Sequence, residues 1–176
     1  MRTPRSEVIA RRGSGTAPAG RTPDLEPIPW TRVDADLRRG EATCWLSAPT
    51  RRGVHTRPVF AAWTGESFVV ASNAAAVKTR HLGTGGRCSL ALGPSGAHLV
   101  FEVEPHRLTR REDLATAVTA FSEVYQWPTR IAGEELDAPY AAPTSGGPPF
   151  RVYELVPVRG HAFPTEDGFA PTRFLF

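Results

Sequence analysis

Short apolar runs separated by turn-forming residues recur along the chain, a pattern typical of β-strands rather than of long helices. In residues 87–92 the side chains of Cys88, Leu90 and Leu92 fall on one face, as expected of a strand with one buried side. The runs predict six strands in order, mostly antiparallel, and hence a mainly β fold closed as a barrel. The expected strands cover residues 42–47, 54–63, 67–71, 87–92, 97–106 and 150–158.

Three segments have helical signals between these strands. Residues 34–39 form a short helix or turn ended by Gly40, and residues 74–82 form a second helix. A third helix follows Thr109, which pairs with Glu112 three residues later in the pattern of a capping box. The apolar residues of this third helix repeat at helical spacing and predict a packing surface: Leu114, Val118, Phe121 and Tyr125.

Proline positions refine the picture of the sheet. Pro58 lies within the second expected strand and cannot donate a ladder hydrogen bond, so this strand is expected at an edge or a bulge. Residues 137–149 are dense in Pro, Gly and Ala and predict a surface loop. Residues 172–176 form a short apolar C-terminus.

The first part of the chain has a different composition. Residues 1–23 are rich in Gly, Pro, Ser and Thr, with too few apolar residues to offset their ordering entropy, and we expect a disordered basic tail followed by one domain at 24–176. A basic arm can bind nucleic acid. The remaining chain has no basic stripe interleaved with aromatics, so a solvated tail is the interpretation we favour. The arginines concerned are Arg2, Arg5, Arg11, Arg12 and Arg21.

Length and residue types exclude several classes of protein. With 176 residues the chain suits one domain, and its net charge is only +3. Cys44 and Cys88 lie inside apolar runs and are expected to be small buried hydrophobes. No apolar run has the length of a membrane span, and no secretory signal begins the chain, which predicts a cytoplasmic protein. The five histidines are scattered without metal-ligand spacing: His55, His81, His98, His106 and His161.

Catalytic patterns of hydrolases are also missing. Glu102 and Glu104 share one strand face and could act as paired carboxylates, but a solvated outer face explains them more simply. No serine lies in a nucleophile-elbow pattern, so the sequence gives no support for hydrolysis by a triad.

The segment from Ala71 to Leu82 carries the clearest candidate chemistry. Small hydroxyl and amide residues end a strand there, and Lys78 and Arg80 follow directly. Lysine offers a compact charge and arginine a planar fork for phosphate oxygens. The pattern therefore indicates a site for a phosphorylated ligand. The alternative is a helix face with solvated Lys78 and Arg80.

At this point the order of the motifs resembles a known family. The segments 45–47, 55–59, 78–82 and 87–90 resemble the pyridoxamine 5'-phosphate oxidase-like split β-barrel superfamily, including its flavin- and deazaflavin-dependent reductases. Segments 125–128, 142–150, 153–157 and 171–176 are similar to an actinobacterial branch of it. The resemblance covers residues 28–176. Relatives commonly have serine, asparagine and tryptophan where this chain has Ala76, His81 and Phe174.

The resemblance implies a six-stranded antiparallel split β-barrel with peripheral helices, which forms a homodimer and holds FMN, or the deazaflavin coenzyme factor 420, in a groove between the subunits. Lys78 would meet the cofactor phosphate with the hydroxyls of Ser72 and Thr79, while Arg57 and Val59 would lie beside the ring and its ribityl chain. The cofactor-binding residues implied are Arg57, Pro58, Val59, Phe60, Ser72, Lys78, Thr79 and Arg80.

The function implied is that of an enzyme, a flavin-type oxidoreductase that transfers hydride to or from a small organic substrate. The cofactor supplies this chemistry, so no catalytic side chain is assigned. Two other readings stay open: a non-catalytic flavin- or haem-binding protein, and a dimeric interaction module with an empty groove. The aromatic candidates for lining the pocket are Trp63, Trp127, Tyr125 and Phe150, with core packing as the alternative for Trp63 and Tyr125.

Overall fold

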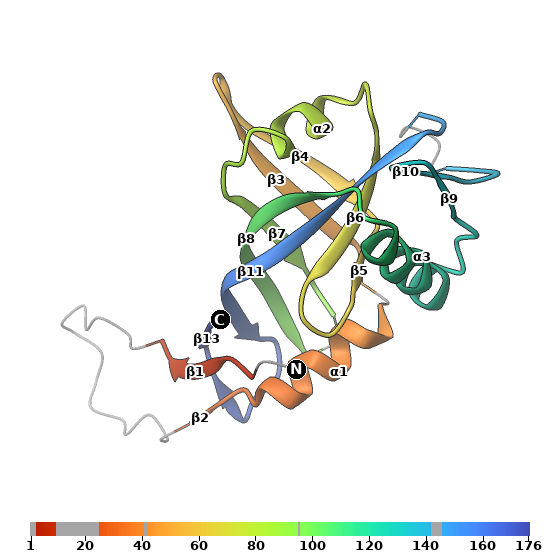
Figure 1. Ribbon diagram of the computed structural model, residues 1–176. Helices are drawn as coiled ribbons and strands as arrows, with labels where there is room; N and C mark the ends of the chain where they lie inside the picture. The colour runs from red at the N-terminus through yellow and green to blue at the C-terminus, as the bar shows by residue number, and fades with distance from the viewer. Residues whose placement is uncertain (1–2, 10–24, 41, 95, 142–145) are drawn as a thin grey trace.

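Six antiparallel strand segments close on one another at the centre of the computed structural model (Figure 1), which describes residues 3–9, 25–40, 42–94, 96–141 and 146–176. Pairing runs from β4 to β3, β7, β8, β11 and β6, and β6 pairs with β5, the continuation of β4. The predicted six-stranded split barrel is confirmed. Its strands are β3 (Cys44–Thr50), β4 (Gly53–Val59) with β5 (Ala61–Trp63), β6 (Phe68–Asn73), β7 (Cys88–Leu92), β8 (Ala97–Leu108) and β11 (Phe150–Pro164).

The barrel changes its pairing at Phe60. Before this residue β4 pairs with β3, with Pro58 opposite Trp45, and β4 ends the path of the large sheet. After it β5 pairs with β6 instead. Because proline lacks a backbone N–H, it is compatible with the free side of an edge strand. The edge position predicted from Pro58 is therefore confirmed.

Alternation along the strands builds the core inside the barrel. Leu90 and Phe101 are completely buried opposite each other on β7 and β8. Gly160 on β11 lies against Phe101, and a Cβ on this residue would come within 2.9 Å of the Phe101 ring. The residue that pairs with Phe101 on β11 is therefore best a glycine, whereas its partner on β7 is Leu90. Cys44 and Cys88 belong to this core, and burial raises the pKa of each thiol to about 11.

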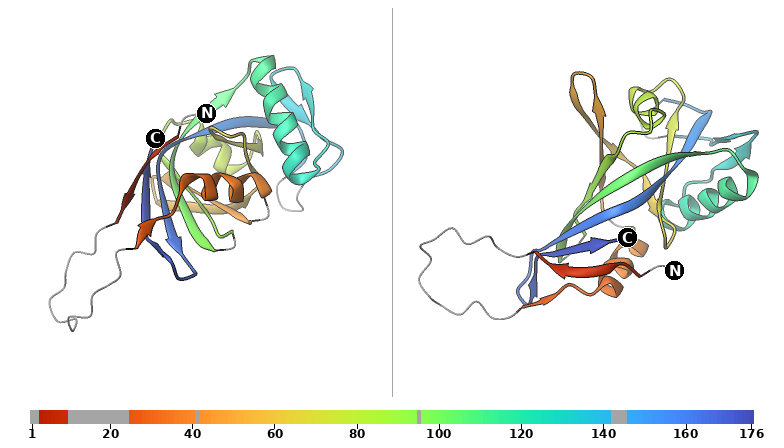
Figure 2. Two further views of the ribbon diagram at one scale, coloured as in Figure 1. Left: turned by 90° about the horizontal axis from the view of Figure 1, so that it is seen from below. Right: turned by 60° about the vertical axis from the view of Figure 1, so that its left-hand side comes forward.

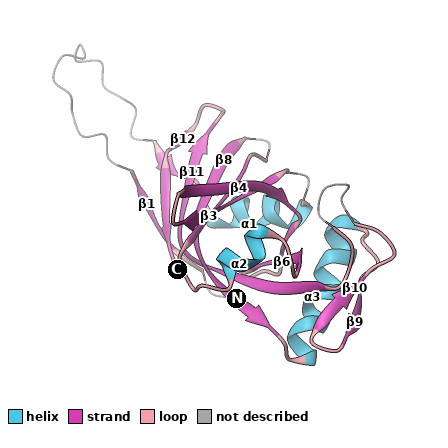
Figure 3. Cartoon of the chain, turned by 90° about the horizontal axis from the view of Figure 1, so that it is seen from above, coloured by secondary structure: helices cyan, strands magenta, loops and turns pink. Residues whose placement is uncertain are grey.

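The three helices lie outside the barrel. α1 (Trp30–Arg39) starts earlier than predicted and ends at Gly40, whose φ of 65° suits glycine. α2 (Val77–Leu82) is shorter than predicted, because residues 74–76 form a turn. Figure 3 shows α3 (Arg111–Tyr125) beside the hairpin of β9 (Arg130–Ala132) and β10 (Glu135–Asp137). No helix among the described residues is both long and apolar enough to cross a membrane.

The predicted capping box at α3 is wrong. The N-cap residue is Arg110, and no side chain caps the helix by a hydrogen bond. Thr109 lies one position too early for its hydroxyl to serve the first turn. Arg110 instead forms ion pairs with Glu112 (3.0 Å) and Asp113 (3.3 Å). The first-turn carboxylates also favour this helix end electrostatically.

The first and last strands of the described chain lie together on the side of the barrel away from α3 (Figure 2). β1 (Arg5–Val8) pairs antiparallel with β13 (Thr172–Leu175), and β13 pairs with β11. β2 (Glu26–Pro27) pairs in parallel with β12 (Phe169–Ala170). Phe174 is fully buried, so the apolar C-terminus packs within its own chain.

The prediction of disorder up to residue 23 is thus wrong for β1. Most of its side chains are exposed, and backbone pairing with β13 orders the segment instead. The disorder prediction was based on the number of apolar side chains, and that number carries no information about backbone pairing between strands. Residues 1–2 and 10–23 of the predicted tail lie outside the described part of the chain.

Candidate functional site

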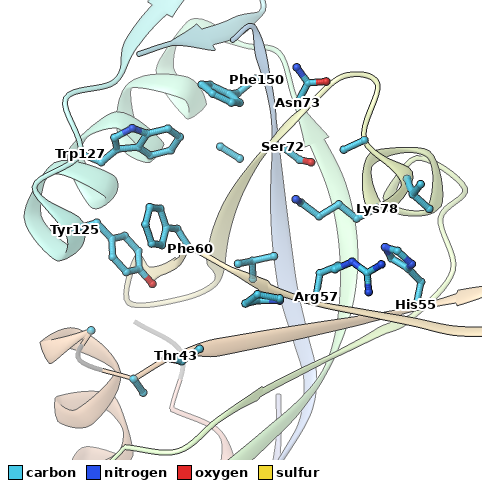
Figure 4. A pocket seen from close by; sticks show the side chains of 17 residues that line it. Thr43, His55, Arg57, Phe60, Ser72, Asn73, Lys78, Tyr125, Trp127 and Phe150 are labelled. Atoms are coloured by element: carbon cyan, nitrogen blue, oxygen red, sulfur yellow. The ribbon is translucent and has the colours of Figure 1, made fainter. Parts of the chain in front are cut away.

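A pocket of about 660 Å³ lies between β4, β6, α2 and the C-terminal end of α3. Figure 4 shows its two unlike ends: Lys78 reaches in from α2 near Arg57 and His55, whereas Phe60, Tyr125 and other aromatic rings gather on the opposite side. The volume falls within the range of roughly 300–1,000 Å³ usual for sites of small molecules and cofactors.

The basic end brings together cations from two elements. Arg57 projects from β4 and Lys78 from the first turn of α2. Burial lowers the pKa of the Lys78 ammonium, and the neighbouring Arg57 guanidinium lowers it further. Among the ion pairs of the described residues, none joins Arg57 or Lys78 to a carboxylate. Like charges held together without a counter-ion suit an anionic ligand.

A buried hydrogen-bond network fixes the start of α2 against β6. Thr79 Oγ1 lies 2.7 Å from Ser72 Oγ and 2.7 Å from the backbone oxygen of Asn73. A carbonyl cannot donate, so Thr79 gives its one proton to Asn73 while the Ser72 hydroxyl can donate to Thr79. The Tyr153 hydroxyl donates to the Thr79 backbone oxygen at 3.3 Å. Ser72 lines the pocket, and its hydroxyl can donate to a ligand when Thr79 turns its own proton from the Asn73 oxygen to Ser72.

The Asn73 side chain closes the neighbouring turn. Its Oδ1 accepts from the Ala75 N–H at 2.8 Å, and its Nδ2 donates to the Gly147 oxygen at 2.6 Å. Residues near 147 are thereby tied to the pocket wall, since Asn73 also lines the pocket.

The aromatic end is held by ring contacts. Phe60 stacks on Tyr125 with centroids 4.5 Å apart, and Trp127 meets Phe60 edge to face at 6.0 Å. Trp127 also packs against Phe150 and Phe121. Offset and edge-to-face arrangements such as these are favourable beyond the area they bury. The rings therefore form a preorganised apolar wall.

Polar atoms at this end already have partners. The Tyr125 hydroxyl accepts from the Ala61 N–H at 3.0 Å and donates to the Ala61 oxygen at 3.1 Å. Burial raises the pKa of Tyr125, which keeps the phenol neutral. The Trp127 indole donates to the Tyr140 oxygen at 2.8 Å. Tyr125 is therefore engaged in structure and is no free proton donor.

The structure brings most of the predicted binding residues to this one pocket. Two do not line it: Thr79 is buried behind Ser72, and Arg80 is exposed outside the lining. The predicted residues that line the pocket are Arg57, Pro58, Val59, Phe60, Ser72 and Lys78. Their binding roles remain predictions.

The aromatic candidates also divide into those that line the pocket and one that does not. Tyr125, Trp127 and Phe150 line the pocket, which confirms their predicted place. Trp63 instead lies in the barrel core, packed against Phe68 at 4.7 Å, with its indole donating to Asp34 at 2.8 Å. For Trp63 the core alternative is therefore correct.

The carboxylates considered as an acid–base pair lie elsewhere. Glu102 forms an ion pair with Arg159 at 3.1 Å and Glu104 with Arg87 at 2.9 Å, both partly exposed. Neither lines the pocket. The interpretation as a solvated face is confirmed.

Among the polar lining residues, sequence reasoning did not assign His55 and Thr43 to the site. His55 had a usable signal, because it stands two positions before Arg57 and shares its strand face. Thr43 had none, since it joins the pocket only through the closure of the barrel, whereas Asn73 is the amide of the segment 71–82 that already indicated the site.

Comparisons with known proteins identify the fold. No protein-family model matches the chain, and no curated protein matches it. Among solved structures, a conserved hypothetical protein from Mycobacterium tuberculosis superposes with a TM-score of 0.59 at 14% identity, covering 80% of this chain and 88% of its own. A NimC/NimA family protein from Clostridium acetobutylicum gives 0.57 at 14% identity, covering 83% and 92%.

A third similar structure is a pyridoxamine 5'-phosphate oxidase-related, FMN-binding protein from Nostoc punctiforme, with a TM-score of 0.52 at 12% identity, covering 85% of this chain and 90% of its own. The fold is the pyridoxamine 5'-phosphate oxidase-like split β-barrel. The resemblance of the sequence motifs to this group is confirmed at the level of fold.

Proposed function

We propose that this chain is an FMN-dependent oxidoreductase that transfers hydride to or from a small, uncharged, conjugated organic molecule. The observation that carries the proposal is one pocket with stacked aromatic rings at one end and, at the other, two cations that form no ion pair among the described residues. FMN has the matching division, a phosphate at one end and a planar ring at the other. The FMN-binding protein of the same fold supports the choice of cofactor.

The residues present fit FMN. Lys78 and Arg57 would hold the phosphate, because they lack carboxylate partners among the described residues and one ammonium plus one guanidinium balances a dianion. The buried Ser72 hydroxyl would add a hydrogen bond. Val59 and the backbone of Pro58 and Phe60 would lie along the ribityl chain and the ring.

The mechanism needs few side chains. FMN, when bound, supplies the hydride chemistry. The chain binds and orients it, and the aromatic end excludes water from the reacting face. Among the described lining residues there is no carboxylate, the Tyr125 hydroxyl is engaged by Ala61, and the protonatable His55 and Lys78 lie at the opposite end from the aromatic rings. A substrate proton must therefore come from solvent or from the substrate itself.

The substrate class follows from the distribution of charge. All charged or titratable nitrogen groups of the lining lie at the basic end, in His55, Arg57 and Lys78. A charged substrate at the aromatic end would lose its hydration without a partner. We therefore expect an uncharged, planar substrate that stacks near Phe60 and Trp127.

The deazaflavin coenzyme factor 420 is the alternative cofactor. Its acidic tail would need a basic rim. Arg51 and Arg52 lie exposed near the turn between β3 and β4, and Arg80 lies exposed on α2. None of the three lines the pocket, which favours FMN.

We further propose that two copies associate and that both contribute to the cofactor groove. Trp45 and Val54 lie on the outer face of the β3–β4 pair, with 47% and 72% of their surface exposed. Trp45 lies beside Pro58 of the pocket, and Phe60 is itself exposed at the rim. Association would cover these apolar side chains. Light scattering at micromolar concentration should give the mass of a dimer, and a monomer there would contradict the proposal.

The decisive experiment identifies the cofactor. The protein is purified, denatured, and the released chromophore is identified by absorbance and mass. FMN, together with turnover of a conjugated acceptor by the reduced holoprotein, is expected. FMN without turnover of any such acceptor would indicate a binding protein, haem would overturn the flavin assignment, and factor 420 would replace the cofactor.

A further inference from the structure

Three titratable or cationic nitrogen side chains line the basic end of the pocket, and two of them are the cations Arg57 and Lys78. The third is His55, which projects from the same face of β4 as Arg57. His81 on α2 lies close by, with its ring centroid 6.1 Å from that of His55. His55 is the one lining residue whose charge can change near neutral pH.

The charged or titratable neighbours described around His55 are all nitrogen bases. Arg57 faces it from its own strand, and Lys78 and His81 face it from α2. β3, which pairs with β4, contains no charged residue, and Ala48 stands opposite His55. Burial lowers the pKa of His55, and Arg57, His81 and Lys78 lower it further. Without an anion, the imidazole is biased toward its neutral form.

We propose that His55 is a further anion-binding residue of this pocket and takes up a proton from solvent when a phosphate monoester binds beside Arg57 and Lys78. The proposal rests on the proposed function, which supplies FMN as the monoester. The dianion offsets the charges of Arg57 and Lys78 and adds anionic oxygens near His55, so it stabilises the imidazolium that the two cations alone disfavour. Only an N–H bond forms, and the buffer supplies the proton.

The sign of the pH dependence follows. The pKa of His55 is higher in the complex than in the free protein, so the complex holds more protons, and affinity rises as pH falls between the two values. One proton limits the slope to about tenfold in Kd per pH unit. The phosphate itself titrates near pH 6. Between pH 7 and 8 the phosphate is mostly dianionic, so proton uptake measured there reports mainly on groups of the protein.

The test is calorimetric titration of FMN into the full chain at pH 7.5, in buffers of different ionisation enthalpy. The dependence of the observed heat on that enthalpy gives the protons taken up. The parent should take up a fraction of one proton, and His55→Gln should take up none and show a flatter dependence of Kd on pH. His98→Gln is the matched control, an exposed histidine of β8 outside the pocket lining, and should behave as the parent.

The proposal is overturned if His55→Gln takes up as many protons as the parent, or if His81→Gln alone abolishes the uptake. A chain that binds no FMN fails the proposed function, and the inference is then tested with inorganic phosphate. The ring resonance of His55, assigned by its loss in His55→Gln, is titrated by NMR in phosphate and in chloride at equal ionic strength. A higher pKa in phosphate supports the proposal, and equal values overturn it.

Discussion

The two ends of the pocket differ in how their polar groups are satisfied. At the aromatic end the Tyr125 hydroxyl and the Trp127 indole each have a backbone partner, and the rings pack on one another. At the basic end Arg57 and Lys78 approach each other without a carboxylate among the described residues. The chain alone satisfies the polar groups of the aromatic end, whereas we propose that a ligand completes the basic end. Substitutions at the first should reduce stability, and those at the second should reduce binding.

Trp127→Ala should show the largest effect, on stability. The side chain is 4% exposed and packs against Phe60, Phe121 and Phe150. Truncation of a buried large aromatic costs roughly 3–5 kcal/mol of unfolding free energy. Chemical denaturation of the apoprotein measures it. Trp45→Ala, an exposed tryptophan, is the control and should cost the monomer little. Equal losses for both would contradict a structural role for the aromatic end.

Lys78→Ala should show the opposite signature. It removes a cation that has no described ion pair, so the stability of the apoprotein should stay unchanged or rise slightly. FMN binding should weaken by roughly 1.5–3 kcal/mol, the range for a hydrogen bond to a charged group, or about ten- to a hundredfold in Kd. Arg80→Ala, from the same helix but outside the pocket lining, should bind FMN as the parent does. Unchanged FMN affinity in Lys78→Ala would remove Lys78 from the site.

Tyr125→Phe tests whether the Tyr125 hydroxyl contributes to stability or to ligand binding. It keeps the ring that stacks on Phe60 but leaves the backbone N–H of Ala61 without the phenol and its oxygen with only the Cys44 thiol at 4.0 Å. Leaving a buried polar group unsatisfied costs about 1–3 kcal/mol. Denaturation should show this loss, with little change in FMN affinity. A selective loss of affinity at full stability would instead mean that the hydroxyl touches the ligand.

Ionic strength should have a smaller effect than these substitutions, and it should act mainly on binding at the basic end. FMN binding should weaken as ionic strength rises, because screening acts on the cations around the phosphate. Riboflavin, which lacks the phosphate, should bind more weakly and with little salt dependence. Fluorescence titrations of both ligands at low and high salt test this. Parallel salt dependence for the two ligands would show that the phosphate does not occupy the basic end.

Removal of residues 1–9 should have the smallest effect on the pocket. β1 pairs with β13 on the side of the barrel away from α3, and its side chains are mostly exposed. Net hydrogen-bond gains of about 0.5–1.5 kcal/mol each are offset by about 1–2 kcal/mol per ordered residue. The melting temperature should therefore fall by a few degrees at most, with FMN affinity unchanged. A large loss of affinity would connect β1 to the site.

The fold was predictable because burial on one face imposes alternation, as in Cys88, Leu90 and Leu92. Lys78 and Arg57 were predictable as site residues from the order of their motifs. Thr79 was misplaced, since helix α2 begins at Val77 and turns its hydroxyl toward Ser72. The strand β1 leaves no apolar pattern, because its contacts with β13 are mostly backbone. His55 shares a strand face with Arg57, which was a usable signal, but its approach to His81 is evident only in the folded chain.

Phe60 has a consequence for how such a protein can diverge. On one side of it β4 pairs with β3 alone, and on the other β5 pairs with β6 alone, so among the described strands the second edge of β4 is free. Substitutions in β4 can therefore reshape the ligand rim while the closed sheet behind it persists. Shared architecture at identities of 12–14% is the expected outcome of this separation. Residues at the pocket rim can therefore be substituted more readily than residues of the barrel core. We expect new ligand selectivity in this chain to arise first between residues 53 and 60.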